Sequence, residues 1–163
     1  MAERGVTTEK ALIRKRGEGS AIWMLGGLYE VKLSADETGG ALTLMEFTIP
    51  VGMGPPVHTH EQDEVVYILE GTATYHLGDQ TTEVGPGSTV YIPKGTVEAF
   101  VPKTTLRLLT IYQPGGADRF FAEAGEPAQR REVPPPPSAP PDIEKLAAVG
   151  KRYGLELLGP PPG

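Results

Sequence analysis

The sequence predicts an all-β protein, an antiparallel sandwich or barrel. Short apolar runs recur through the middle of the chain, and turn signals rather than helical patterns separate them. Glycine and proline, 21 and 17 of the 163 residues, lie mostly at those turns or in the C-terminal tail. Because this length fits one domain, the runs are expected to share a single core.

The expected strands follow one another closely. Apolar Tyr29, Val31 and Leu33 alternate with polar residues, as in a strand with one buried face. A hairpin connection at 36–40 leads into a second strand over 41–49. Further strands are expected at 57–60, 64–70, 72–77, 80–84, 88–92, 96–101 and 105–112.

Helical patterns are confined to the C-terminal part. Residues 117–124 predict a short helix that ends at Gly125 and caps the barrel, with a moving lid as the alternative. Six prolines within 134–141 predict an extended spacer. The alternative is that this run binds an SH3-like module. Asp142 is a good N-cap for a second helix that reaches about Tyr153.

One face of this second helix is expected to dock on the barrel or on a partner subunit. It consists of Ile143, Leu146, Ala147, Gly150 and Tyr153. The chain then divides into an N-terminal arm (1–19), a barrel with its capping helix (20–125), a proline-rich linker (126–141), and a C-terminal helix and tail (142–163).

Composition excludes several classes of function. The net charge is −6, and no stripe of basic residues interleaved with aromatic ones is present, which argues against a nucleic-acid partner. No apolar run has the length of a membrane-spanning helix, and the first residues lack the apolar core of a secretion signal. The absence of cysteine excludes disulfides and thiolate chemistry, which fits a cytoplasmic protein.

The strongest sign of chemistry is His58-Thr59-His60, with Glu64 four residues later. Residues i and i+2 of a strand point to one face, so both imidazoles can reach one ion, and Glu64 shares their parity if the strand continues. Two imidazoles and one carboxylate form the facial triad of non-haem iron and related sites. We therefore predict a metal site; an exposed polar pair is the alternative.

These residues resemble a known family. Gly52, His58, His60, Glu64 and Gly71 reproduce, with all its spacings, the first motif of the cupin superfamily, G-x5-H-x-H-x3-E-x6-G. The second motif, G-x5-P-x-G-x2-H-x3-N, begins with Gly87, Pro93 and Gly95. It then departs from the family, because its histidine and asparagine positions hold Glu98 and Pro102.

The resemblance implies a cupin jelly-roll barrel, similar to small bacterial cupins of the quercetin-dioxygenase-like group. It implies that His58, His60 and Glu64 bind one divalent metal ion (Fe, Mn, Ni, Zn or Co). Glu98 stands where the family has its fourth ligand. It is either a carboxylate ligand or, with a pKa raised by burial and by Glu64, a general acid/base. Glu98 and Glu64 are thus candidate catalytic residues as well as candidate ligands.

The expected pocket is apolar. Val66 and Phe100 share the inward parity of the two glutamates, and Phe47 and Leu109 are further candidate walls, with Ile49 and Ile111 beside them. Such a pocket suits an aromatic, flavonoid-like or polyketide-like molecule. We expect an oxygenase, or an isomerase or cyclase, that acts on a small molecule. We also expect the protein to be a homodimer. The alternative is a cupin that binds a ligand without turnover.

Overall fold

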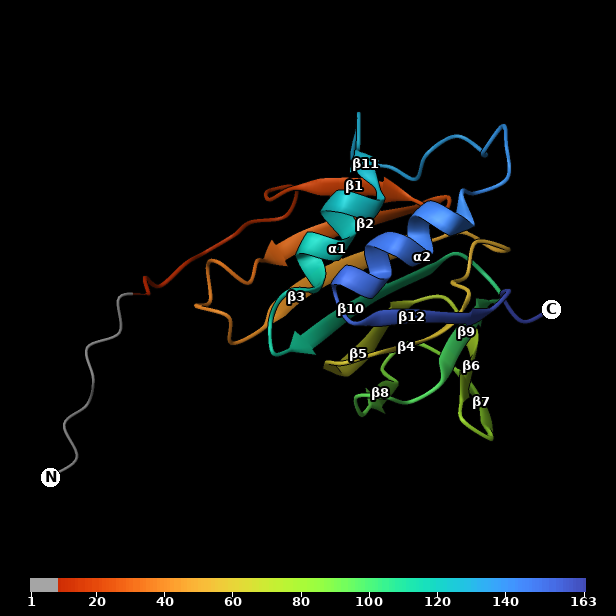
Figure 1. Cartoon of the computed structure of the whole chain (residues 1–163). Helices are drawn as coiled ribbons and strands as arrows, with labels where there is room; N and C mark the ends of the chain where they lie inside the picture. Colours follow the sequence, from red (N-terminus) through yellow and green to blue (C-terminus); the bar gives the residue numbers. More distant parts are fainter. Residues whose placement is uncertain (1–8) are drawn as a thin grey trace, which may run out of the picture.

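The computed structural model describes residues 9–163, so residues 1–8 of the expected N-terminal arm lie outside the described part. In that part, two antiparallel sheets and two helices account for the regular structure (Figure 1). The strands are β1 (Ala21–Met24), β2 (Gly27–Leu33), β3 (Thr43–Ile49), β4 (Val57–His60), β5 (Asp63–Glu70), β6 (Ala73–Leu77), β7 (Gln80–Val84), β8 (Thr89–Ile92), β9 (Glu98–Pro102), β10 (Leu106–Gln113), β11 (Glu126–Pro127) and β12 (Leu155–Gly159). The helices are α1 (Ala117–Ala124) and α2 (Ile143–Arg152).

The strand order is that of a jelly roll. The larger sheet runs β11-β1-β2-β3-β10-β5-β8, and the smaller one runs β12-β4-β9-β6-β7. Strands that follow one another in the chain repeatedly lie in different sheets, as β4 and β5 do, and β10 returns to lie between β3 and β5. These crossovers close the two sheets around one core, and the predicted all-β barrel is confirmed.

Alternation along the strands selects the side chains that fill this core. In β3, Met45, Phe47 and Ile49 are buried, whereas the residues between them are half-buried on the outer face. In β10, Leu106 and Leu108 are buried by the same parity. A period of two is what a pleated strand with one core-facing side requires.

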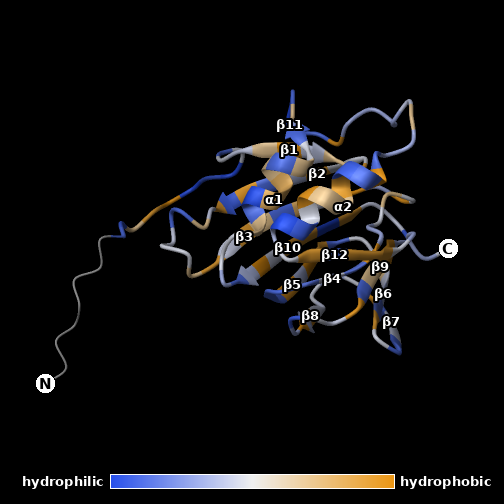
Figure 2. Cartoon of the chain, in the orientation of Figure 1, coloured by the Kyte–Doolittle hydropathy of each residue, from blue (hydrophilic) through white to orange (hydrophobic). Residues whose placement is uncertain are grey.

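The two helices lie together beside β12, on one side of the barrel (Figure 1). The first is tied to the larger sheet, because the Asp118 carboxylate accepts hydrogen bonds from the Thr43 hydroxyl at 2.7 Å and the Ala35 amide at 3.2 Å. The second begins as predicted, since the Asp142 carboxylate accepts the Lys145 amide at 3.0 Å. Figure 2 shows hydrophilic and hydrophobic residues alternating around both helices, as expected of helices with one covered face.

The covered face of α2 agrees with the expected one except at two positions. Leu146 and Gly150 are buried as expected, whereas Ile143 is 46% exposed and Val149 is buried instead. Gly150 meets β12, where a Cβ would lie 2.9 Å from the Leu155 side chain. Packing against the next strand therefore decides which face is covered.

Three strands were not expected from the sequence: β1, β11 and β12. Strands β1 and β11 are short and pair with each other, and β12 lies at the edge of the smaller sheet. Short edge strands carry too few alternating positions to give a clear periodic signal. The most consequential is β12, because it pairs with β4: Leu157 faces His58, and Leu155 faces His60.

Candidate metal centre

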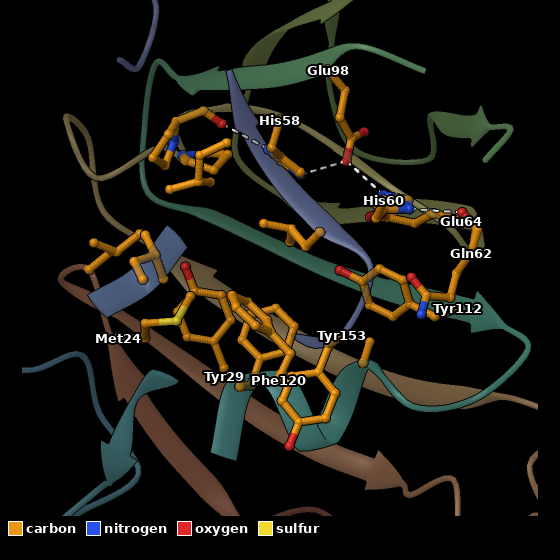
Figure 3. A pocket seen from close by; sticks show the side chains of 18 of the residues that line it. Met24, Tyr29, His58, His60, Gln62, Glu64, Glu98, Tyr112, Phe120 and Tyr153 are labelled. Atoms are coloured by element: carbon orange, nitrogen blue, oxygen red, sulfur yellow. Dashed lines mark hydrogen bonds and ion pairs between the residues drawn. The ribbon is translucent and has the colours of Figure 1, made fainter. Parts of the chain in front are cut away.

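The two motif histidines and Glu98 meet inside the barrel. Both histidines belong to β4, and Glu98 opens β9, where it is the direct cross-strand partner of His58. The Glu98 Oε1 atom lies 2.9 Å from the Nε2 atom of His58 and 2.9 Å from that of His60 (Figure 3). One ligand atom from each residue lies within 4.8 Å of those of the other two. Strand parity and register thus aim three donors at one point.

Backbone carbonyls fix the orientation of both imidazoles. The Nδ1 atom of His58 donates to the Pro56 carbonyl at 2.8 Å, and that of His60 donates to the Gln62 carbonyl at 2.8 Å. Since a carbonyl oxygen only accepts, the proton of each neutral ring resides on Nδ1. The Nε2 lone pairs then point at Glu98, which is the arrangement that metal-binding histidines use.

Glu64 lies beside this group rather than within it. Its Oε2 atom is 3.2 Å from the His60 Nε2 atom, and its Oε1 atom accepts a hydrogen bond of 3.0 Å from the Thr110 hydroxyl. Glu64 and Thr110 are both buried. The structure therefore brings together the four residues expected at the centre, with His58, His60 and Glu98 as the compact set.

The two glutamates differ in their affinity for a proton. Burial raises the pKa of Glu64, and the nearby charge of Glu98 raises it further. Burial also opposes ionisation of Glu98, but hydrogen bonds from His58 and His60 outweigh it and lower the pKa to about 2. The expectation of a raised pKa at Glu98 is therefore corrected: the glutamate with the raised pKa is Glu64.

The same contacts act on the histidines in reverse. Burial alone would lower the pKa of His60, but its hydrogen bonds to Glu64 and Glu98 raise it to about 10. The pKa of His58 is also raised, because Glu98 outweighs the effect of burial. The two carboxylates thus stabilise positive charge between the imidazole rings. Either protons or a metal ion can supply that charge.

This donor set fits a divalent transition-metal ion. Two neutral imidazole nitrogens with fixed tautomers and one ionised carboxylate are donors that Fe, Mn, Co, Ni and Zn all accept. Without a metal ion, the Glu98 oxygen at 2.9 Å from each Nε2 atom requires a proton between it and each nitrogen. His58, His60 and Glu98 would hold such an ion, and Glu64 is near enough to act as a further ligand or to stay free.

A largely apolar cavity of about 80 Å³, with several aromatic walls, ends at these four residues (Figure 3). Its aromatic rings contact one another: Tyr29 stacks on Phe121 at 4.9 Å between ring centroids, and Tyr112 meets His60 edge-on at 5.7 Å. The side chains that line it are Met24, Leu25, Tyr29, Phe47, Pro55, Pro56, His58, His60, Gln62, Glu64, Glu98, Phe100, Tyr112, Ala117, Phe120, Phe121, Leu146, Tyr153, Leu155 and Leu157.

Two of the four expected pocket walls line this cavity, Phe47 and Phe100. The other two, Val66 and Leu109, do not, and that part of the expectation is corrected. Val66 is buried in the core. Leu109 is opposite Tyr67, which is 47% exposed, so it belongs to the outer face of the larger sheet, as does Ile111.

The walls that sequence reasoning missed come from two sources. Tyr112 shares the buried parity of Leu106 and Leu108, and correct phasing of β10 would have identified it. Phe120 and Phe121 were assigned to a capping helix, and the cap turns out to be a wall of the cavity. Leu155 and Leu157 lie on β12, which the sequence did not predict.

Comparisons with known proteins agree with this geometry. Residues 45–112 match the model of the cupin domain family. An uncharacterized protein of Streptomyces coelicolor is 33% identical over 69 residues, covering 42% of this chain and 66% of that protein. Quercetin 2,3-dioxygenase of Bacillus subtilis is 25% identical over 129 residues, covering 78% of this chain and 38% of the dioxygenase. The chain thus spans less than two thirds of the length of these relatives.

Solved structures show the same fold. The polyketide cyclase RemF from Streptomyces resistomycificus is 30% identical with a TM-score of 0.50, covering 60% of this chain and 69% of the cyclase. An RmlC-like cupin from Shewanella frigidimarina is 18% identical with a TM-score of 0.58, covering 67% of this chain and 96% of that one. Within residues 9–163, no helix has the length and apolar character needed to cross a membrane. The barrel, the motif histidines at its centre and these matches together show that the chain belongs to the cupin superfamily.

Proposed function

We propose that this cupin is a metal-dependent enzyme that moves a proton on an aromatic or polyketide-like small molecule, as an isomerase or cyclase does. The observation that carries the proposal is an aromatic cavity that ends at two buried glutamates with opposite pKa shifts. Pairs of carboxyl groups whose environments separate their pKa values commonly divide the roles of acid and charge stabiliser. The similarity to a polyketide cyclase supports the substrate class.

Each residue has a defined part in this proposal. His58, His60 and Glu98 hold a divalent ion, which when bound supplies Lewis-acid stabilisation for a substrate oxygen. Glu64 holds or accepts the proton, because burial and Glu98 raise its pKa towards the range in which proton transfer is efficient. The Thr110 hydroxyl orients the Glu64 carboxyl, and the aromatic walls exclude water.

Conservative variants of the two glutamates separate these roles. Glu98→Gln removes the charge between the histidines, so we expect the metal content to fall. Glu64→Gln keeps the shape but cannot exchange a proton, so we expect retained metal and lost turnover. A suitable first assay is solvent-deuterium incorporation into benzoylacetone, an aromatic β-diketone with an acidic carbon. Loss of metal in Glu64→Gln, or full exchange without it, would contradict the assignment.

A second candidate function is dioxygen-dependent cleavage of a flavonoid-like substrate. The similarity to quercetin 2,3-dioxygenase over most of this chain favours it. Oxygen uptake with quercetin as substrate distinguishes it from proton transfer, which consumes no oxygen. If neither assay gives turnover while both compounds bind, the protein is a ligand-binding cupin. A homodimer stays a prediction, to be measured as molar mass by light scattering.

A further inference from the structure

A second, larger space adjoins the inner cavity. We call it the outer groove; it has a volume of about 670 Å³ and lies between the β1–β2 turn, the loop before β4, and the proline-rich segment. The inner cavity and the outer groove share the side chains of Met24, Leu25, Pro56 and Leu146. These four residues therefore form a partition between the groove and the cavity that ends at the metal centre.

The inner cavity needs an entrance that can open. Its volume of about 80 Å³ is well below the roughly 300–1,000 Å³ of pockets that enclose drug-sized ligands. The outer groove alone lies within that range. An aromatic substrate that reaches His58 must therefore displace side chains. Those of the partition border space on both sides. His60, Leu155 and Leu157 also border an outer space, but they lie on the paired strands β4 and β12.

The far wall of the outer groove is held in place. The Trp23 indole Nε1 donates to the Glu132 carbonyl at 2.8 Å, and the Arg131 guanidinium pairs with the buried carboxylate of Glu30 on β2 at 2.9 Å. These contacts anchor the chain just before the prolines, of which Pro134, Pro135 and Pro137 line the groove. The expected spacer thus serves as a fixed apolar wall, and motion is left to the partition.

Leu25 is the unusual member of the partition. With Gly26 it forms the two-residue turn between β1 and β2, and both residues have positive φ, 49° and 78°. Such type I′ turns strongly favour asparagine, aspartate or glycine at the first position, because a branched side chain is strained there. Leucine therefore opposes the turn's own preference, and what it provides instead is an apolar side chain at the partition.

We propose that the substrate enters from the outer groove and that Leu25 is the specificity-determining residue that limits its passage. This inference rests on the proposed function for the nature of the substrate, an apolar aromatic molecule. Met24 stands beside Tyr29 on the side of the cavity away from Glu98 (Figure 3), so this part of the partition lies apart from the metal centre. Small or planar molecules pass, and bulky ones are held in the groove.

The first experiment needs no substrate. The full chain, treated with EDTA, is reacted with diethyl pyrocarbonate, and peptide mass spectrometry follows modification of His58. His76, which contacts Thr81 on the β6–β7 hairpin, is the internal reference. Leu25→Gly opens the passage and suits the turn, so we expect His58 to react about tenfold faster relative to His76, and Leu25→Phe to slow it.

Leu44→Ala is the matched control. Leu44 is also half-buried, but it faces Ile111 across the larger sheet and borders neither space. We expect this variant to leave the relative rate within about twofold of wild type. Equal rates at His58 in all four proteins would overturn the passage. A similar acceleration in Leu44→Ala would assign the effect to general loosening and would also overturn it.

The second experiment uses quercetin as the probe. Trp23 is the single tryptophan and lines the outer groove, so stopped-flow quenching of its fluorescence follows entry. A residue that gates a passage changes association and dissociation rates by one factor and leaves Kd unchanged, whereas a binding contact changes mainly dissociation. We expect the first pattern in Leu25→Gly. A change in dissociation alone would make Leu25 a contact and contradict the proposal.

The two experiments separate the passage from the substrate class. If His58 modification depends on residue 25 but quercetin does not bind, the passage stands and the flavonoid-like substrate of the second candidate function fails. If quercetin binds and neither rate depends on residue 25, the proposed function survives and the passage is overturned.

Discussion

The metal-free protein should lose stability as the pH rises from neutrality, because the centre stores protons. The pKa of His60 rises from an ordinary 6.5 to about 10 on folding, through Glu64 and Glu98. A group whose pKa is raised in the folded state stabilises fully below its unfolded pKa and loses that effect as the pH rises through its folded pKa. The window for His60 is therefore pH 6.5 to about 10.

The size of the effect follows from proton linkage. Where the folded chain binds one proton more than the unfolded chain, the free energy of unfolding falls by about 1.4 kcal/mol for each unit by which the pH rises. Between pH 7 and 9, His60 alone accounts for about 3 kcal/mol. The raised pKa of His58 acts with the same sign. This is a large share of the roughly 5–15 kcal/mol that a domain typically has.

The assay is urea unfolding of EDTA-treated protein at several pH values. Glu98→Gln removes one carboxylate from both histidines, so its stability should depend less on pH. His76→Asn is the control, because His76 lies on the β6–β7 hairpin, and it should keep the wild-type slope. Metal should reverse the trend, since its affinity rises with pH as the ligands lose protons. A stability that is level or rising between pH 7 and 9 in the metal-free wild type would refute the reasoning.

Three further outcomes can be measured directly. Protein purified without added metal should hold about one divalent ion per chain by elemental analysis, and a His58→Ala, His60→Ala variant should hold none; equal content in both would place the ion elsewhere. Thr110→Val leaves the buried Glu64 carboxyl without its hydroxyl donor, so urea unfolding should show a loss of about 1–3 kcal/mol; an unchanged midpoint would contradict the hydrogen bond. Trp23→Phe removes the indole donor to the chain before the prolines and should cost about 1 kcal/mol by the same assay, a value near zero showing that this anchor is unnecessary.

Local sequence signals predicted much of the fold, and two of the four expected pocket walls line the cavity. The strands from β2 to β10 were predicted to within about two residues, the usual uncertainty of element boundaries, because each has alternation and a flanking glycine or proline. Strand parity predicted that His58 and His60 act together, and the resemblance to the second cupin motif pointed to Glu98; the ligand atoms of these three residues lie within 4.8 Å of one another. Leu109 was misassigned because alternation shows that every second residue of a strand is buried, but not which set faces inward. Its partners on the neighbouring strands, Glu46 and Tyr67, place Leu109 on the outer face.

What the sequence did not predict depends on contacts between distant segments. The lowered pKa of Glu98 requires both imidazoles within hydrogen-bonding distance, and burial alone suggested the opposite direction. The edge strand β12 alternates over only five residues, too few to be recognised in the sequence, and its pairing with β4 defines it. The partition at Leu25 follows from two spaces that only the folded chain encloses.

The pairing of β12 with β4 bears on how the centre is assembled. On its other side, β4 is joined to β9 by the single pair His58–Glu98, whereas β12 pairs with it from Val57 to His60. The histidines are synthesised early, yet the neighbour that holds their strand follows only after the proline-rich segment and α2. Contacts so far apart in the chain form late in folding. A cut within the proline-rich segment would therefore turn the histidine strand into an open edge, and ion binding would report whether that segment is intact.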